Sequence, residues 1–200
     1  MIHSIAGLPA LAWMPAGNAS TVDGGAGSLA LTAAPGVDWS NDALGGAPQH
    51  RAAALGFIAP ASFSLSARVR VDSPRTTFDA GALCLWADSD HWAKLCFEYS
   101  PGGEAMVVSV VTNGHSDDCN AAVVADPWTY LRVSRVGPAW AFHSSSNGTE
   151  WSFVRLFRLH TDQPVHVGFL SQAPMGEACV ARFDHIAFGG QAPANLRDGS

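Results

Sequence analysis

Apolar and polar residues alternate in short runs along most of the chain. The clearest run is residues 63–71, where Phe, Leu, Ala and Val occupy every second position and Ser and Arg lie between them. A period of two is typical of a β-strand with one buried and one polar face. Further strand-like runs are residues 28–32, 81–87, 92–99, 105–112, 129–136, 139–144, 152–158, 165–172 and 180–188. Many short strands without a long segment of helical period predict an all-β sandwich or barrel.

The most informative stretch is residues 83–99, which we expect to form a hairpin around a three-residue turn at 89–91. One face of this hairpin is apolar, and the other carries Trp86, Trp92, Lys94 and Glu98. The predicted register places Trp86 opposite Lys94, within reach of a cation–π contact. A slip by one residue would bury Lys94 and Glu98 in the core, so the assignment of the faces is strongly specified.

Two interpretations of this polar face remain open. It is either a solvated outer sheet face with a Lys that snorkels to water, or a concave face that binds a polar, ring-shaped ligand. In the second case the Trp rings offer a flat apolar platform, Lys94 a hydrogen-bond donor and Glu98 an acceptor. A sugar or another hydroxylated small molecule would suit such a face.

Two polar loops are candidate rims of the same site. The loop at 37–42 contains Trp39, which either anchors the loop in the core or borders the site. The residues after the strand at 105–112 include Thr112 and Asp117, and we expect a loop of Asx-turns there. Direct ligand contact and cation binding are the alternatives for this second loop, but its spacing does not match an EF-hand, so we predict no metal and no cofactor.

Composition narrows the class of protein. Of 200 residues, 48% are apolar and 14% are charged, and Lys94 is the one Lys among eleven basic residues. A net charge of −6 without a basic cluster argues against binding to nucleic acid, and no apolar run is long enough for a membrane span. The first residues lack the basic region of a signal peptide, so we expect a cytoplasmic protein.

Domain organisation and cysteine usage add two further expectations. We predict a single domain over residues 1–200, with a core at about 8–190 and a frayed tail at 189–200. The four cysteines show no zinc spacing and are expected to be free thiols. In the predicted hairpin register Cys84 faces Cys96, where a disulfide would need an oxidising compartment.

Several segments together resemble a known family. They are Phe78–Leu85, Asp90–Glu98, Ser109–Thr112, Ser116–Asp118, Leu131–Arg135 and Phe142–Trp151. These residues resemble the uncharacterised YesU-like family of bacteria and fungi, to which the yeast regulation-of-enolase protein is related. The resemblance covers residues from about 11 to 188 and implies a concanavalin A-like jelly-roll sandwich of two antiparallel sheets. Relatives of that fold include lectins and glucanases, but the family carries no reaction that can be transferred.

Three functions follow from these observations. We favour a carbohydrate- or small-polyol-binding protein without catalysis. The first alternative is a sugar-active hydrolase in which Glu98 pairs with an acid such as Asp79 or Asp117, although no Glu-x-Asp-x-Glu run is present. The second is a structural or regulatory domain whose Trp face meets a protein partner, a second copy of the chain included.

Overall fold

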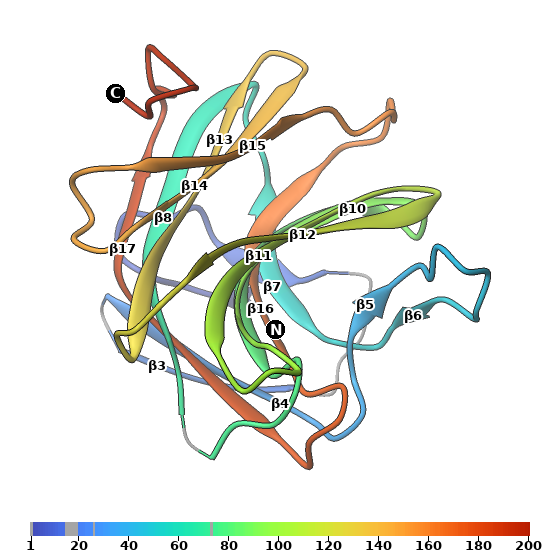
Figure 1. The fold of residues 1–200 in the computed structure, drawn as a ribbon. Coiled ribbons are helices and arrows are strands. Elements are labelled where there is room, and N and C mark those ends of the chain that lie inside the picture. The colour runs from blue at the N-terminus through green and yellow to red at the C-terminus, as the bar shows by residue number, and fades with distance from the viewer. Residues whose placement is uncertain (1, 15–19, 26, 73) are drawn as a thin grey trace.

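Two antiparallel sheets pack face to face in the computed structural model, which describes residues 2–14, 20–25, 27–72 and 74–200 (Figure 1). One sheet has eight strands in the order β1 (Ile2–His3), β2 (Leu11–Trp13), β7 (Ala54–Ile58), β16 (His166–Gln172), β9 (Ala80–Asp88), β10 (His91–Tyr99), β11 (Ala105–Asn113) and β12 (His115–Val123). The other has seven, in the order β15 (Ser152–Phe157), β14 (Ala139–Ser145), β13 (Trp128–Val136), β8 (Ser62–Val71), β17 (Cys179–Gly189), β4 (Ser28–Ala33) and β3 (Ser20–Gly25). The prediction of an all-β jelly-roll sandwich is therefore confirmed.

The core lies between the two sheets. Aromatic side chains interlock across it, with ring centroids 5.2 Å apart for Phe57 and Phe188 and 5.1 Å apart for Phe169 and Phe183. Gly81 allows close approach at this point, because an added Cβ would lie 2.8 Å from Val69 in the facing sheet. No helix in the described part of the chain has the length and hydropathy needed to span a bilayer.

The hairpin formed by β9 and β10 has the predicted faces but different cross-strand partners. Trp86 pairs with Trp92, and Lys94 pairs with Cys84, because the register shifts at a bulge between His91 and Trp92. Asp88 favours this tighter turn, since its carboxylate accepts a hydrogen bond from the backbone N–H of residue 90 at 2.9 Å. The predicted pairings of Trp86 with Lys94 and of the two hairpin cysteines are therefore wrong. The change of two in the summed residue numbers leaves every side chain on its predicted face.

All four cysteines are free in the structure. Cys96 lies opposite Ala82, not opposite Cys84, so the two thiols are not a cross-strand pair. Burial raises the pKa of both hairpin thiols well above its ordinary value. They therefore behave as small apolar side chains within the sheet.

One predicted loop is a strand. Residues after Gly114, expected to form Asx-turns, pair along β11 as the edge strand β12. The sequence pattern concealed this strand because both of its faces are largely exposed, so it has no buried alternation.

The C-terminal segment was expected to fray, but the structure holds its last residues against the seven-stranded sheet. His143 Nε2 donates to the Leu196 carbonyl at 2.8 Å, and Arg132 Nη2 donates to the Gly199 carbonyl at 2.7 Å. Turns close the segment on itself, with the N–H of Gly199 donating to the Asn195 carbonyl. Side-chain donors on β13 and β14 thus supply hydrogen bonds that a sequence pattern does not reveal.

Candidate functional site

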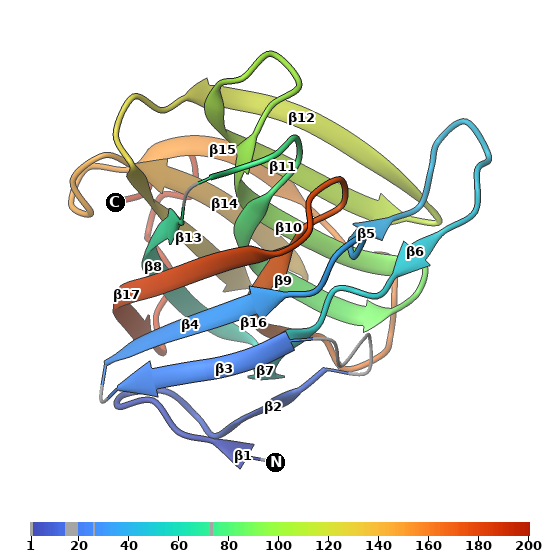
Figure 2. The ribbon, with the colours of Figure 1, turned by 90° about the horizontal axis from the view of Figure 1, so that it is seen from below.

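The site lies on the outer face of the eight-stranded sheet, which we define as the face turned away from the seven-stranded sheet. Part of this face is covered by residues 37–52, which include the short strands β5 (Trp39–Ser40) and β6 (Gln49–His50). These two strands form a sheet of their own beside the larger ones (Figure 2). The covering segment is fixed at one end by an isolated bridge between Val37 and Ala173.

The aromatic rings of the hairpin are sealed under this covering segment. The Trp39 ring packs on Trp86, with centroids 4.7 Å apart, and on Trp92, with centroids 5.8 Å apart. Its indole N–H donates to the Ala52 carbonyl at 2.7 Å. Trp92 is fully buried and Trp86 is 5% exposed, so neither ring is available to a ligand or a protein partner at the surface.

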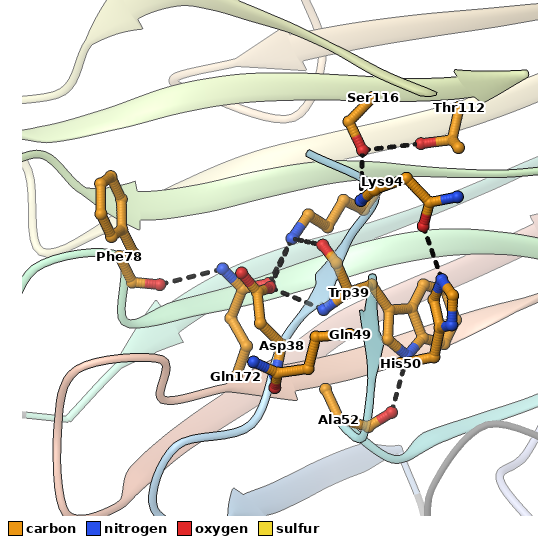
Figure 3. A network of polar contacts seen from close by, with 11 residues as sticks. Asp38, Trp39, Gln49, His50, Ala52, Phe78, Lys94, Thr112, Ser116 and Gln172 are labelled. Atoms are coloured by element: carbon orange, nitrogen blue, oxygen red, sulfur yellow. Dashed lines mark hydrogen bonds and ion pairs between the residues drawn. The ribbon is translucent and has the colours of Figure 1, made fainter. Parts of the chain in front are cut away.

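Lys94 ties the covering segment to the sheet (Figure 3). Its Nζ donates to Asp38 Oδ1 at 2.6 Å, to the Trp39 carbonyl at 2.8 Å and to Gln172 Oε1 at 2.8 Å. Burial alone would lower the pKa of Lys94, but the adjacent Asp38 carboxylate outweighs it and keeps the pKa above its ordinary value. An ammonium group has three donors, so Lys94 has none left for a ligand.

Beyond Lys94 the same face opens into a cavity of about 240 Å³. This volume is below the roughly 300–1,000 Å³ of sites for drug-sized ligands, so it suits one small ring. The lining includes Asp38, Trp39, Phe78, Lys94, Glu98, Asp118, Asn120 and Gln172. These residues come from the covering segment, from β10 and β12, and from the ends of β9 and β16.

Glu98 is the buried group without a partner in this cavity. It is 8% exposed, and its carboxylate forms no hydrogen bond or ion pair with any residue that the structure describes. Burial raises the pKa of Glu98 to about 7, the Asp38 and Asp118 carboxylates raise it further, and Lys94 opposes them. A buried acceptor left unpaired costs free energy that a hydrogen-bonding ligand recovers.

The edge strand β12 adds a second acceptor. Asp118 lies in the same cross-strand row as Lys94, with Val110 between them. Burial raises the pKa of Asp118, and Lys94 again opposes this effect. The ionisable groups free to meet a ligand are therefore carboxylates, so the pocket presents acceptors.

The aromatic group at the pocket is Phe78, just before β9. Its ring is 37% exposed and its φ is 67°, which is uncommon for a residue other than Gly. The conformation is held because Phe78 N donates to the Tyr99 carbonyl at 2.7 Å and Gln172 Nε2 donates to the Phe78 carbonyl at 2.9 Å. Since Gln172 also accepts from Lys94, one hydrogen-bond chain joins the covering segment to this ring (Figure 3).

The sequence-predicted site residues divide into three groups. Trp39, Lys94 and Glu98 line the pocket, and Trp39 is also a buried anchor. Trp86, Trp92 and Thr112 are buried in the same face but do not line the pocket.

The other two predicted carboxylates lie outside the pocket. Asp117 belongs to the opposite face of β12, where its carboxylate pairs with Arg155 of β15 at 2.7 Å. Asp79 is buried in the turn before β9, where it accepts from Thr76 N at 2.8 Å. Both carboxylates stabilise the frame around the site.

Sequence reasoning gave no role to Asp38, Phe78 or Gln172. Phe78 begins the first segment that carries the family resemblance, so its place before the hairpin was the available signal. Among the residues with described positions, no three His, Cys, Asp or Glu side chains are grouped as metal ligands would be.

The fold and this site define the chain as a concanavalin A-like jelly-roll sandwich with an acidic pocket on the outer face of its larger sheet. The chain belongs to the family described as "Protein of unknown function (DUF1349)", whose model matches residues 13–190. The predicted family resemblance is thereby confirmed.

The similar proteins are a yeast relative and several β-sandwich structures. "Regulation of enolase protein 1" of Saccharomyces cerevisiae is 33% identical over 115 residues, which is 56% of this chain and 57% of that protein's length. A functionally unknown protein from the same yeast has a TM-score of 0.80 at 24% identity, covering 90% of this chain and 96% of that one. These matches show the family and the fold.

Two more distant structures belong to enzymes. A xylan β-1,4-xylosidase of Bacillus halodurans has a TM-score of 0.64 at 14% identity, covering 80% of this chain and 32% of that one. An alginate lyase of Klebsiella pneumoniae has a TM-score of 0.55 at 13% identity, covering 88% and 86%. At these identities the likeness is one of fold.

Proposed function

We propose that this protein binds a neutral carbohydrate or small polyol in the pocket beside Lys94. The observation that carries the proposal is the Glu98 carboxylate, buried and without a hydrogen-bond partner among the described residues, in a pocket that also presents the exposed Phe78 ring. A sugar ring supplies both complements, since its hydroxyls donate to carboxylates and its C–H face packs on an aromatic ring. Enzymes named for xylan and alginate share the fold, which supports the class of ligand.

The charges in the pocket set the expected selectivity. Lys94 is neutralised by Asp38, which leaves Glu98 and Asp118 facing the ligand. A uronate or a sugar phosphate would bring a like charge next to them, and such pairs are destabilising at short range. Neutral sugars and polyols are therefore expected to bind, and their anionic derivatives to bind at least about ten-fold more weakly.

A thermal-shift screen tests this proposal with neutral monosaccharides, polyols and the matching uronates and sugar phosphates. A ligand at a hundred times its Kd adds about 2.7 kcal/mol of stability, which is readily detected. Phe78→Ala should abolish the shift, while Leu156→Ala, a similar truncation of an exposed side chain on the other sheet, should leave it unchanged. Stabilisation by the anionic compounds alone would contradict the proposal.

A hydrolase is the second candidate, and one observation favours it. A carboxyl group with a pKa of about 7 is suited to general acid catalysis near neutral pH. Its partner would be Asp118, which lines the same pocket, whereas Asp79 and Asp117 do not. Hydrolysis of aryl glycosides by the native chain that disappears in Glu98→Gln would establish this activity, and no turnover by the native chain would exclude it for those substrates.

A further inference from the structure

A second polar centre lies on the opposite side of the molecule, on the face of the seven-stranded sheet turned away from the core. Arg132 of β13 and His143 of β14 are direct cross-strand partners there. Arg132 is 8% exposed and His143 is fully buried. The Trp151 ring covers the guanidinium, with its centroid 4.2 Å from the Arg132 Cζ.

Arg132 is buried without a counter-charge. None of the acidic groups in the described ranges lies within ion-pair distance of it, and burial lowers its pKa to about 10 with no neighbouring acid to offset the effect. Its Nε and the Nδ1 of His143 are buried and have no hydrogen-bond partner among the described residues. Buried guanidinium groups are ordinarily paired, because an unpaired buried charge is strongly destabilising.

Another arginine on the same sheet shows what this edge of a guanidinium binds. Arg68 uses Nε and Nη2 to hold both carboxylate oxygens of Asp184, each at 2.7 Å. In Arg132 the same two nitrogens meet a single acceptor, the Gly199 carbonyl on Nη2. The two-pronged edge of the more buried arginine is therefore only half used.

The acceptors at this centre come from the main chain of the C-terminal segment. Gly199 and Leu196 contribute carbonyl oxygens, while the side chain of Asp198 bonds to residues within its own turn. A neutral carbonyl is a weaker partner for a guanidinium than an oxyanion, which makes charge-assisted and bidentate hydrogen bonds.

We propose that Arg132 and His143 form a binding site for a carboxylate or phosphate group, and that residues 195–199 occupy it as a tethered substitute. An arriving oxyanion would take both Nε and Nη2 of Arg132 and displace the segment. This site is independent of the pocket beside Lys94.

The test uses a substitution that releases the segment from the full-length chain. Gly199 has a φ of 79°, and an added Cβ would lie 2.5 Å from Arg132 Nη2 and 2.8 Å from Trp151 Cβ, so Gly199→Val should undock it. Gly190→Val is the matched control, because a Cβ at Gly190 meets open space. Undocking is read from the amide resonances of residues 195–199.

Inorganic phosphate and acetate are the probes, titrated by NMR against chloride at equal ionic strength. We expect Gly199→Val to bind at least one probe about ten-fold more tightly than the native chain and Gly190→Val, with shifts at Arg132 Nε–H and His143. Adding Arg132→Gln should abolish the gain. A chain ending at Ala194 repeats the test if the Val variant stays docked. Failure of both released forms to bind either probe, or binding that survives Arg132→Gln, would overturn the proposal.

Discussion

Two ends of one strand face show opposite chemistry. At the covered end, Lys94 donates three hydrogen bonds and the neighbouring Trp rings are sealed beneath residues 37–52. Four residues further along β10, Glu98 has no hydrogen bond within the described structure and looks into a cavity beside an exposed aromatic ring. The contrast separates groups that hold the fold from groups that await a ligand, although both ends are polar and buried.

The largest expected effect comes from breaking the covered end. Lys94→Met should destabilise the protein by about 3–5 kcal/mol, because it leaves the Asp38 carboxylate without its buried partner. Denaturant unfolding measures this loss. Adding Asp38→Asn to Lys94→Met should recover part of it, and a loss below about 1 kcal/mol for the single variant would show that the network is not structural.

Glu98→Gln should have the opposite sign at high pH. Folding raises the pKa of Glu98 from 4.5 to about 7, so the native carboxyl adds no penalty below about pH 4.5 and becomes costly as pH rises toward 7 and above. The variant should therefore be more stable than the native chain by on the order of 2–3 kcal/mol at about pH 8, and equally stable near pH 4. Unfolding curves across this range measure the difference, and a variant less stable at pH 8 would contradict the assigned burial.

Phe78→Gly should separate stability from binding. Gly adopts the positive φ at this position without strain, which is worth about 1 kcal/mol, and this gain offsets the lost contacts of a partly exposed ring. We expect unfolding free energies within about 1 kcal/mol of the native value and a loss of sugar binding. Unchanged binding in a folded Phe78→Gly variant would remove the ring from the site.

The smallest effect is expected outside the pocket. Asp117→Asn breaks an ion pair with Arg155 whose carboxylate is 71% exposed, so it should cost less than about 1 kcal/mol. Ligand binding should be unaffected, because Asp117 faces away from the cavity. Calorimetric titration of the variant with a ligand found in the screen checks this, and weakened binding would extend the site across β12.

These contrasts show how far the sequence could lead. A period of two fixed most strands and both faces of the hairpin, since an offset of two residues in pairing leaves the faces unchanged. The true partners depend on a bulge stabilised by one side chain, Asp88, which a pattern does not reveal. The exposed edge strand β12 was missed because it has no buried side to mark it.

The site was only half visible for a related reason. Lys94 and Glu98 stood out as charged residues on a strand otherwise rich in apolar side chains. Asp38 lies 56 residues from Lys94 in sequence, and Gln172 lies 78 residues from it. Contacts over such separations follow from the topology of the sheets, and they are what turned the predicted ligand donor into a group already saturated by the protein.

The most direct test of the contrast between the two ends is side-chain NMR during titration with the neutral sugars and polyols. We expect the Glu98 carboxyl and Phe78 ring resonances to move in a saturable way, while the indole N–H signals of Trp86 and Trp92 and the Lys94 ammonium stay in place. Movement of the Trp and Lys94 signals without a response at Glu98 would contradict the account, as would the absence of any saturable shift.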